Sequence, residues 1–312
     1  MKKECYVIMS EVIDFLMKNK KADGSYSVLH PITKTANVKT SEDITVMLKS
    51  NVGSYANGDV IAAGTSVDAV VRKLLQVQIP PVYTAPSTDI SVTAGDKGGS
   101  YEEGTSVNPT FSGAFTKNDA GALSNIVIKK NDVQVATSES SPVTHNETFV
   151  VSGTIVFNAT ATYAAGEVEK DNFGEDYPTG RITAGSKTSG NITYTGYRKY
   201  FWGADNVAEA AASSANIRAL SNSSSAAAAA GTKITLSVTK GQTRATFAYP
   251  ATLRDVTSVK YVEMGNDESK ALFTKSTVAV EGANGHTAID YKVYTLIPDQ
   301  PFPSNMTFDI TI

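Results

Sequence analysis

The chain of 312 residues contains one cysteine, Cys5, so it cannot form an intrachain disulfide bond. Chains without disulfides are typical of proteins that fold in a reducing cytoplasm. The three histidines, His30, His145 and His286, are far apart in the sequence. With a single cysteine they do not form the Cys/His clusters that bind zinc. The sequence therefore predicts no disulfide framework and no metal centre of this type.

Motifs for catalysis and for nucleotide binding are also missing. The sequence has no GxSxG nucleophile motif, no P-loop and no EF-hand loop. The formal net charge of −3 gives no general reason to expect binding to nucleic acid. We therefore expect a protein that is not an enzyme, that needs no cofactor and that has no nucleic-acid partner.

Long apolar runs are absent as well. The N-terminal stretch MKKECYVIMSEVIDFLMKNKK begins like a signal peptide, but Glu4, Glu11 and Asp14 interrupt it and no small-residue cleavage site follows. We expect neither secretion by this route nor a membrane span. Residues 6–17 instead have apolar side chains at helical spacing, which predicts one amphipathic helix packed on its own domain or on a neighbouring subunit.

A second helix is predicted before Pro80, with an apolar stripe over residues 67–75. Thr65 or Ser66 can cap its N-terminus, Asp68 falls in the first turn, and Pro80 and Pro81 stop it. A helix of about three turns is marginal alone, so its apolar stripe needs a partner surface, within the chain or on a second copy. The candidate oligomer or anchor contacts are Val67, Val70, Val71, Leu74 and Leu75.

The rest of the chain has the short alternating runs of β-structure, which indicate a mainly β fold. Residues 1–80 are expected to form an α+β assembly or anchoring region. Two β-sandwich modules of Ig-like layout are expected to follow, at 81–195 and 196–312. The predicted strands are 26–29, 44–48, 89–93, 126–130, 154–163, 181–186, 234–238, 245–249, 261–264, 277–280, 288–296 and a paired C-terminal strand at 306–312.

Residues 204–231 form one biased segment, in which alanine and serine dominate. Its first half is predicted to be helical through Val207, Ala211, Ile217 and Leu220. Its second half has too few apolar side chains to bury and is predicted to be a mobile connection.

The chain's only tryptophan lies in the aromatic cluster GYRKYFWG, residues 196–203. Such clusters usually mark a core or a joint between domains, because aromatic side chains bury more area than any others. The alternative is that exposed rings stack on sugars of host-surface glycans. The candidate interdomain or glycan-facing residues are Tyr197, Tyr200, Phe201 and Trp202.

An acidic segment gives the best candidate for a cation site. Several carboxylates in one loop can hold calcium, which prefers oxygen ligands, although a solvated loop is the more common reason for such a charge run. The same carboxylates could also form a glycosidase pair, but nothing in the sequence places two of them at the required separation. The residues are Glu167, Glu169, Asp171, Glu175 and Asp176.

A family resemblance rests on the order of several stretches. A helix closed by prolines leads into PPVYTAPSTDISVTAG, YEEGTSV, ITAGSKTSG and TGYRKYFWG, followed by IRALSNS, FAYP and YKVYTLIPDQPFPSNMTFDITI. This order, over roughly residues 60–312, resembles the modular fibre and appendage proteins of tailed bacteriophages, particularly gut phages. The resemblance implies a non-enzymatic homo-oligomer, often a trimer, in which an N-terminal virion-attachment region precedes Ig-like modules. It supplies no catalytic residues, and the long repeats of extended tail fibres are missing.

The expected function is therefore that of a virion structural protein, a head- or tail-attached fibre that contacts a capsid or tail protein. It would be synthesised in the bacterial host cytoplasm, lie on the virion surface and present its β-modules to the host for attachment. The alternatives are a bacterial surface adhesin or carbohydrate-binding module, which needs an export signal, and a glycan-processing β-sandwich enzyme that uses Glu175 or Asp176.

Overall fold

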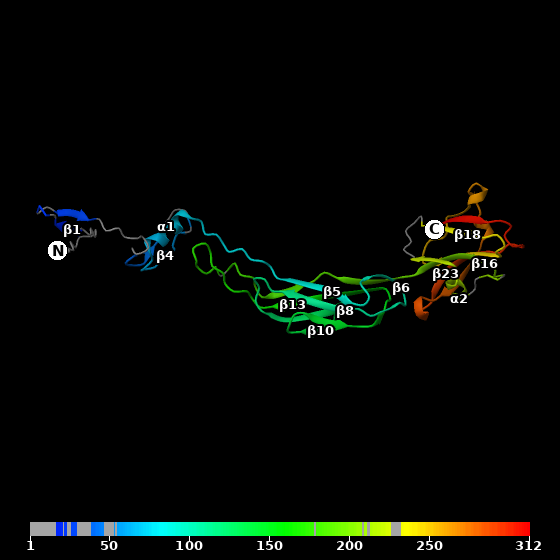
Figure 1. The fold of residues 1–312 in the computed structure, drawn as a ribbon, viewed down its shortest axis with the longest axis horizontal. Coiled ribbons are helices and arrows are strands. Elements are labelled where there is room, and N and C mark those ends of the chain that lie inside the picture. Colours follow the sequence, from blue (N-terminus) through cyan, green and yellow to red (C-terminus); the bar gives the residue numbers. More distant parts are fainter. Residues whose placement is uncertain are drawn as a thin grey trace. The chain divides into compact units, whose positions relative to one another are not determined.

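The computed structural model confirms a mainly β fold with two short α-helices, α1 (Val67–Leu75) and α2 (Ser214–Arg218), in the part of the chain that it describes (Figure 1). Two compact units divide the chain: residues 1–84 with 167–182, and residues 85–166 with 183–312. The residues described are 17–20, 22–23, 26–29, 39–46, 53, 55–177, 179–207, 209–210, 213–225 and 232–312.

The N-terminal unit contains two small antiparallel pairs of strands, β1 with β2 and β3 with β4. The strand predicted at 26–29 is confirmed, and the one predicted at 44–48 is described only over β3. The helix predicted over 6–17 lies outside the described residues except for Met17, which begins β1 and is therefore not helical. The bounds are β1 Met17–Lys20, β2 Tyr26–Leu29, β3 Ile44–Thr45 and β4 Val60–Ile61.

Helix α1 begins after the predicted cap and covers the predicted stripe, but it ends before it reaches Pro80. Ser66 caps it, because its side-chain oxygen accepts a hydrogen bond from the Ala69 amide at 3.2 Å. Asp68 lies in the first turn and forms an ion pair with Arg72 one turn later. The helix ends at Leu75, and the chain continues in an extended conformation at Gln76.

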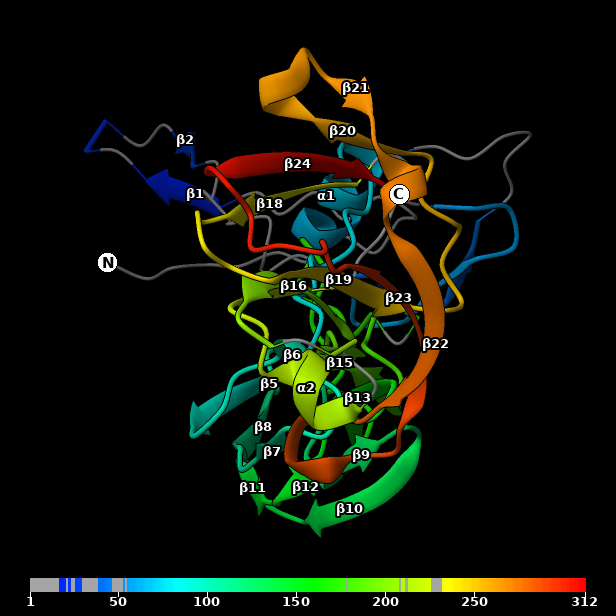
Figure 2. The same ribbon diagram turned by 90° about the vertical axis from the view of Figure 1, so that its right-hand side faces the viewer.

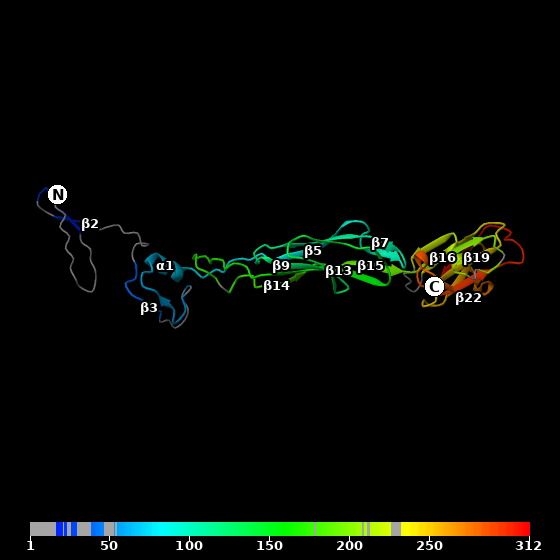
Figure 3. The same ribbon diagram turned by 90° about the horizontal axis from the view of Figure 1, so that it is seen from below.

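Two sheets of the first β-module, one of six strands and one of three, enclose a shared core (Figure 3). Phe111 and Phe157, one from each sheet, stack with their ring centroids 4.1 Å apart. The strand order of the six-stranded sheet is β10 (Val133–Ser138), β9 (Leu123–Lys130), β13 (Thr154–Tyr163), β15 (Ile192–Tyr197) and β6 (Gly99–Glu102), and β14 (Gly185–Thr188) also pairs with β13. The order of the three-stranded sheet is β11 (Val143–Asn146), β8 (Thr110–Thr116) and β5 (Ser87–Ala94). A separate short pair is formed by β7 (Ser106–Val107) and β12 (Phe149–Val150).

The second β-module also has two sheets, and its C-terminal strand β24 is paired on both sides, by β18 and β20. Pairing of the C-terminal strand is therefore confirmed. One sheet, partly labelled in Figure 2, is β17 (Asn222–Ser225), β16 (Lys199–Asp205), β19 (Arg244–Pro250), β23 (Ile289–Leu296) and β22 (Thr274–Val280); the other is β18 (Lys233–Val238), β24 (Met306–Thr311), β20 (Ser258–Tyr261) and β21 (Asp267–Glu268).

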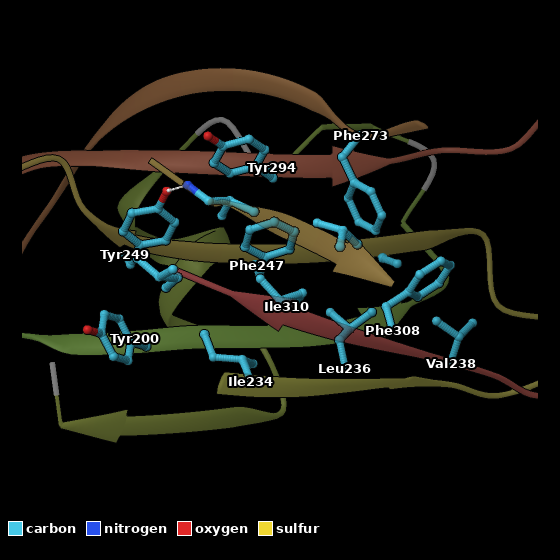
Figure 4. Close-up of a cluster of buried hydrophobic side chains, with 14 of the residues drawn as sticks. Tyr200, Ile234, Leu236, Val238, Phe247, Tyr249, Phe273, Tyr294, Phe308 and Ile310 are labelled. Carbon is cyan, nitrogen blue, oxygen red and sulfur yellow. Dashed lines mark hydrogen bonds between the residues drawn. The ribbon is translucent and has the colours of Figure 1, made fainter. Parts of the chain in front are cut away.

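Aromatic rings fill the space between these two sheets (Figure 4). Phe247 and Tyr294 stack at 4.8 Å, and Phe308 packs edge-on against Phe273. The buried Tyr249 hydroxyl accepts a hydrogen bond from the Val256 amide at 3.1 Å. The alternation in the sequence predicts one buried face for 245–249, but all of β19 is buried, because a second cluster that includes residues of α2 and β22 covers its other face.

Several predicted elements are wrong in extent: the strands predicted at 126–130 and 277–280 each begin three residues earlier, at Leu123 and Thr274. Three further elements differ more. The strand predicted at 181–186 begins only at Gly185, because the chain up to Ile182 belongs to the N-terminal unit. Residues 262–264 form a 3-10 turn that ends at Gly265 with φ 73°, rather than continuing β20. Among the described residues of the Ala/Ser segment, 214–218 alone are helical, because the Ser213 side chain accepts a hydrogen bond from the Asn216 amide and starts the helix there. In the half predicted to be a mobile connection, Asn222–Ser225 form strand β17, and 226–231 lie outside the described residues.

Candidate functional site

The first candidate site is an apolar surface on the N-terminal unit. No residue of α1 is buried: Val67 and Val70 are half-buried, whereas Val71, Leu74 and Leu75 are exposed. Leu75 exposes 80% of its surface. The predicted stripe is thus present on the helix, but the described part of the unit leaves its C-terminal half uncovered.

The extended chain after α1 adds three more exposed apolar side chains, Val77, Ile79 and Val82, the last of them 95% exposed. We call the six residues Val71, Leu74, Leu75, Val77, Ile79 and Val82 the apolar surface. Eight of the fifteen large apolar side chains exposed in the described part of the chain lie between residues 44 and 82. Exposed apolar side chains are therefore concentrated in the N-terminal unit.

Asn172, which lies in the loop of the acidic segment, binds the backbone of this extended chain. Its side chain accepts a hydrogen bond from the Ile79 amide at 2.7 Å and donates one to the Val77 carbonyl at 3.2 Å. Backbone groups of the segment thus have partners within the unit, while the apolar side chains beside them are exposed. The loop shapes the apolar surface without covering it.

Three of the five candidate calcium ligands, Asp171, Glu175 and Asp176, have other partners. The Asp171 carboxylate accepts hydrogen bonds from the Gln78 side chain at 2.6 Å and from the Phe173 and Glu175 amides. Burial raises the Asp171 pKa, but these hydrogen bonds outweigh it and lower the pKa below its ordinary value. The carboxylate therefore braces the loop against the segment after α1.

Glu175 and Asp176, named above for the alternative of a glycan-processing enzyme, each form an ion pair with a lysine. Glu175 lies 2.6 Å from Lys73, and Asp176 lies 3.1 Å from Lys170. Among the described residues, no group of three or more histidine, cysteine or acidic side chains has an arrangement suited to a metal ion. The acidic segment thus has a visible structural role within the N-terminal unit.

The candidate aromatic residues lie mainly in the core of the second module. Tyr200 and Phe201 are buried on opposite faces of β16, Tyr200 edge-on to Tyr249 and Phe201 beside Tyr291. Trp202 is half-buried and packs against the same core as Tyr200. These rings serve the core of one module, and the buried rings of Tyr200 and Phe201 offer no platform for a sugar.

Tyr197 has a different position, half-buried at the boundary of the two modules. It lines a groove of about 410 Å³ together with residues of both modules, including Glu103, Arg198, Leu253 and Ile289. The aromatic cluster therefore reaches the joint through Tyr197, whereas its other rings lie in the second module.

The joint itself contains a single connecting residue. Strand β15 of the first module ends at Tyr197 and β16 of the second begins at Lys199, so Arg198 alone links the two sheets. The Arg198 side chain is only 9% exposed. Its guanidinium donates hydrogen bonds to the Glu103 carboxylate and to the Thr287 carbonyl, both at 2.6 Å.

A second carboxylate in the same turn binds two more cations of the second module. Glu102 accepts a hydrogen bond from Arg218 at 2.6 Å and forms an ion pair with Lys199 at 3.0 Å. Burial raises the Glu102 pKa, but the hydrogen bonds from Arg218 and Lys199 outweigh it, so the pKa lies below its ordinary value. The joint thus pairs two acidic residues of the first module with three basic residues. These are the linker residue Arg198 and, in the second module, Lys199 and Arg218.

Backbone contacts reinforce these ion pairs. The Ala283 amide donates to the Glu103 carbonyl at 2.7 Å, and the Asn284 side chain donates to the Gly104 carbonyl at 3.1 Å. Gly104 has φ +95°, and a Cβ placed there would lie 2.1 Å from the Ala283 carbonyl oxygen. Only glycine permits this approach. We call Glu102, Glu103, Gly104, Arg198 and Arg218, with the turn 282–287, the clasp.

Sequence reasoning missed the clasp. The only available signals were the Glu-Glu-Gly of YEEGTSV and the arginine inside GYRKYFWG. Neither shows that residues 95 positions apart, Glu103 and Arg198, form an ion pair. Nothing local in the sequence identifies such long-range partners.

A shallow groove of about 570 Å³ on the second module is lined by charged residues that already have partners. Asp255 binds Lys275 and Lys292, whose hydrogen bonds lower its pKa to about 2. Glu268 accepts hydrogen bonds from the Val259 and Lys270 amides. These side chains hold loops onto the sheet, so the groove presents no unpaired acid for a ligand.

No family model, no curated protein and no solved structure matches this chain. In the described part of the chain, neither helix has the length and apolar character needed to cross a membrane. The function is therefore inferred from the apolar surface, from the two β-modules and from the clasp.

Proposed function

We propose that this chain is a non-enzymatic structural protein of a tailed-phage virion, a fibre attached to the head or tail that presents β-modules to the host surface. The observation that carries this proposal is the concentration of exposed apolar side chains on the N-terminal unit. The order of modules, an anchoring region followed by β-sandwiches, supports it together with the family resemblance.

The apolar surface supplies the attachment. Exposed apolar side chains that are concentrated in one region of a protein often mark an interaction site. Fully burying one Val, Leu or Ile side chain contributes about 1.5–3 kcal/mol, so six side chains together can drive association even after its entropic cost. In this proposal the surface packs against the same surface on other copies of the chain, and the resulting oligomer sits on a capsid or tail protein.

The β-modules supply the outward-facing part. Many of their charged side chains pair within the chain, and their loops and strand edges remain exposed. An oligomer that displays several such modules can hold a host surface through weak contacts, because linked contacts reinforce one another without a deep pocket.

Location in the virion tests this proposal. Purified virions of the phage that encodes the chain should contain it in a fixed copy number, and antibody fragments against residues 85–312 should label one defined position in electron micrographs. Virions that lack the chain would overturn the proposal. Tight binding of the free chain to a glycan array, with no copies in virions, would favour the adhesin or carbohydrate-binding alternative.

A further inference from the structure

We infer that the clasp locks the two β-modules into a single rigid body. This inference goes beyond the proposed function, since it concerns the transmission of position and force through the chain and holds whatever the chain binds. Modules in one chain commonly move relative to each other unless their interface is extensive. Here the linker is one residue, Arg198, and its side chain is bonded to both sides.

The ion pairs make opening costly. Glu102 and Arg198 are each about nine-tenths buried, and both are fully engaged. Opening the joint separates buried charges from partners that satisfy them, and a buried charge without its partner is strongly unfavourable. Because Glu102 is held by Arg218 and Lys199 together, loss of one contact leaves the other in place.

The backbone contacts fix how the two modules are placed relative to each other. A turn of the second module donates the Ala283 amide to the Glu103 carbonyl, while its Asn284 side chain reaches Gly104. Both Gly104 and Gly282 lack a side chain, and this allows the two backbones to meet. A Cβ placed at Gly282 would lie 2.3 Å from the Glu103 carbonyl oxygen. A flexible joint would require neither glycine. Two close backbone approaches and two bound acids therefore select one relative placement of the modules.

Distances between paired spin labels test the rigidity in the full chain. Cys5→Ser removes the native thiol, and Thr144→Cys with Ser237→Cys places one label on an exposed strand position of each module. The labelled chain is mixed with an excess of unlabelled chain, so that only distances within one copy are measured even in an oligomer. In this background we expect a single narrow distance distribution. Gly104→Ala should broaden it at least about twofold, because the added methyl group collides with the Ala283 carbonyl and the modules then move independently.

A matched control separates the clasp from backbone strain. Gly241 has φ +90°, close to that of Gly104, but a Cβ there meets nothing within 4 Å. Gly241→Ala should therefore carry the same conformational cost and leave the distribution narrow. The double variant Glu102→Gln, Glu103→Gln tests the charges without adding volume, and it should broaden the distribution even if Gly104→Ala fails to fold.

Two results would overturn the inference. One is a broad distribution in the labelled chain without clasp substitutions. The other is a distribution that stays narrow in the Glu102→Gln, Glu103→Gln variant. Neither depends on where the protein resides, so failure here is distinct from failure of the proposed virion role.

Discussion

Arg198 and Glu103 join the two β-modules through an ion pair of 2.6 Å, although the residues are 95 positions apart in the sequence. Arg198 occupies the only position between the last strand of one module and the first strand of the next. Arg198 therefore lies directly between a strand of each module, and its side chain donates hydrogen bonds to both modules. The modules are thus coupled mechanically as well as covalently.

Glu102→Gln should weaken this coupling and lower the free energy of unfolding by about 1–3 kcal/mol, because Arg218 and Lys199 lose their charged acceptor. Urea denaturation measures the change. Asp255→Asn is the matched control: it also removes an acid with two basic partners, but its side chain is 56% exposed and the loss should stay below about 1 kcal/mol. Equal losses in the two variants would contradict a special role for Glu102.

Acid should weaken the same contact. The Glu102 pKa in the folded chain lies below its ordinary value of 4.5, so the carboxylate contributes its stabilisation fully above about pH 4.5. That contribution is lost as the pH falls through the lowered pKa of the folded state. The difference in unfolding free energy between the wild type and Glu102→Gln should therefore shrink as the pH falls below the ordinary value of 4.5 and through the lowered pKa. A difference that stays constant or grows in acid would show that the charge of Glu102 does not matter.

The aromatic core of the second module should tolerate truncation poorly. Phe308 is fully buried between Tyr261 and Phe273, so Phe308→Ala should cost about 3–5 kcal/mol through lost burial and a cavity. Met264→Ala, at a position that is 59% exposed, should change stability by no more than about 0.5 kcal/mol. Thermal unfolding followed by circular dichroism compares the two. Similar melting temperatures for both variants would contradict the packing described here.

The sequence predicts elements well where the relevant interactions are local. Helix 67–75 has its cap and its stripe close together in the sequence, so its start and its stripe are found, although it ends before the prolines that were expected to stop it. Strand 154–163 has a regular alternation and is found with its observed bounds. The loop 167–182 is different. It folds onto 77–79, more than ninety residues away, through Asn172 and Asp171, and no local pattern encodes these contacts.

The same distinction applies to the candidate sites. The stripe of α1 follows from the spacing of its apolar residues, whereas the exposed side chains of Val77, Ile79 and Val82 after it do not. In the aromatic cluster, composition indicates burial but not which module each ring enters. The burial of Tyr200 and Phe201 depends on which strands flank β16, which only the topology shows.

The assembly role of the apolar surface is the central claim, and the mass of the protein in solution tests it most directly. Sedimentation equilibrium should show the full chain as a discrete oligomer, with a trimer expected from the family resemblance. Leu75→Asp with Val82→Asp places two charges on the apolar surface and should give monomers, since charges are costly to bury in an apolar contact. Val133→Asp, at an isolated position that is 67% exposed on the first module, should leave the oligomer intact. A wild-type chain that is monomeric at all concentrations, or an oligomer that the Leu75 and Val82 substitutions do not disturb, would contradict the claim.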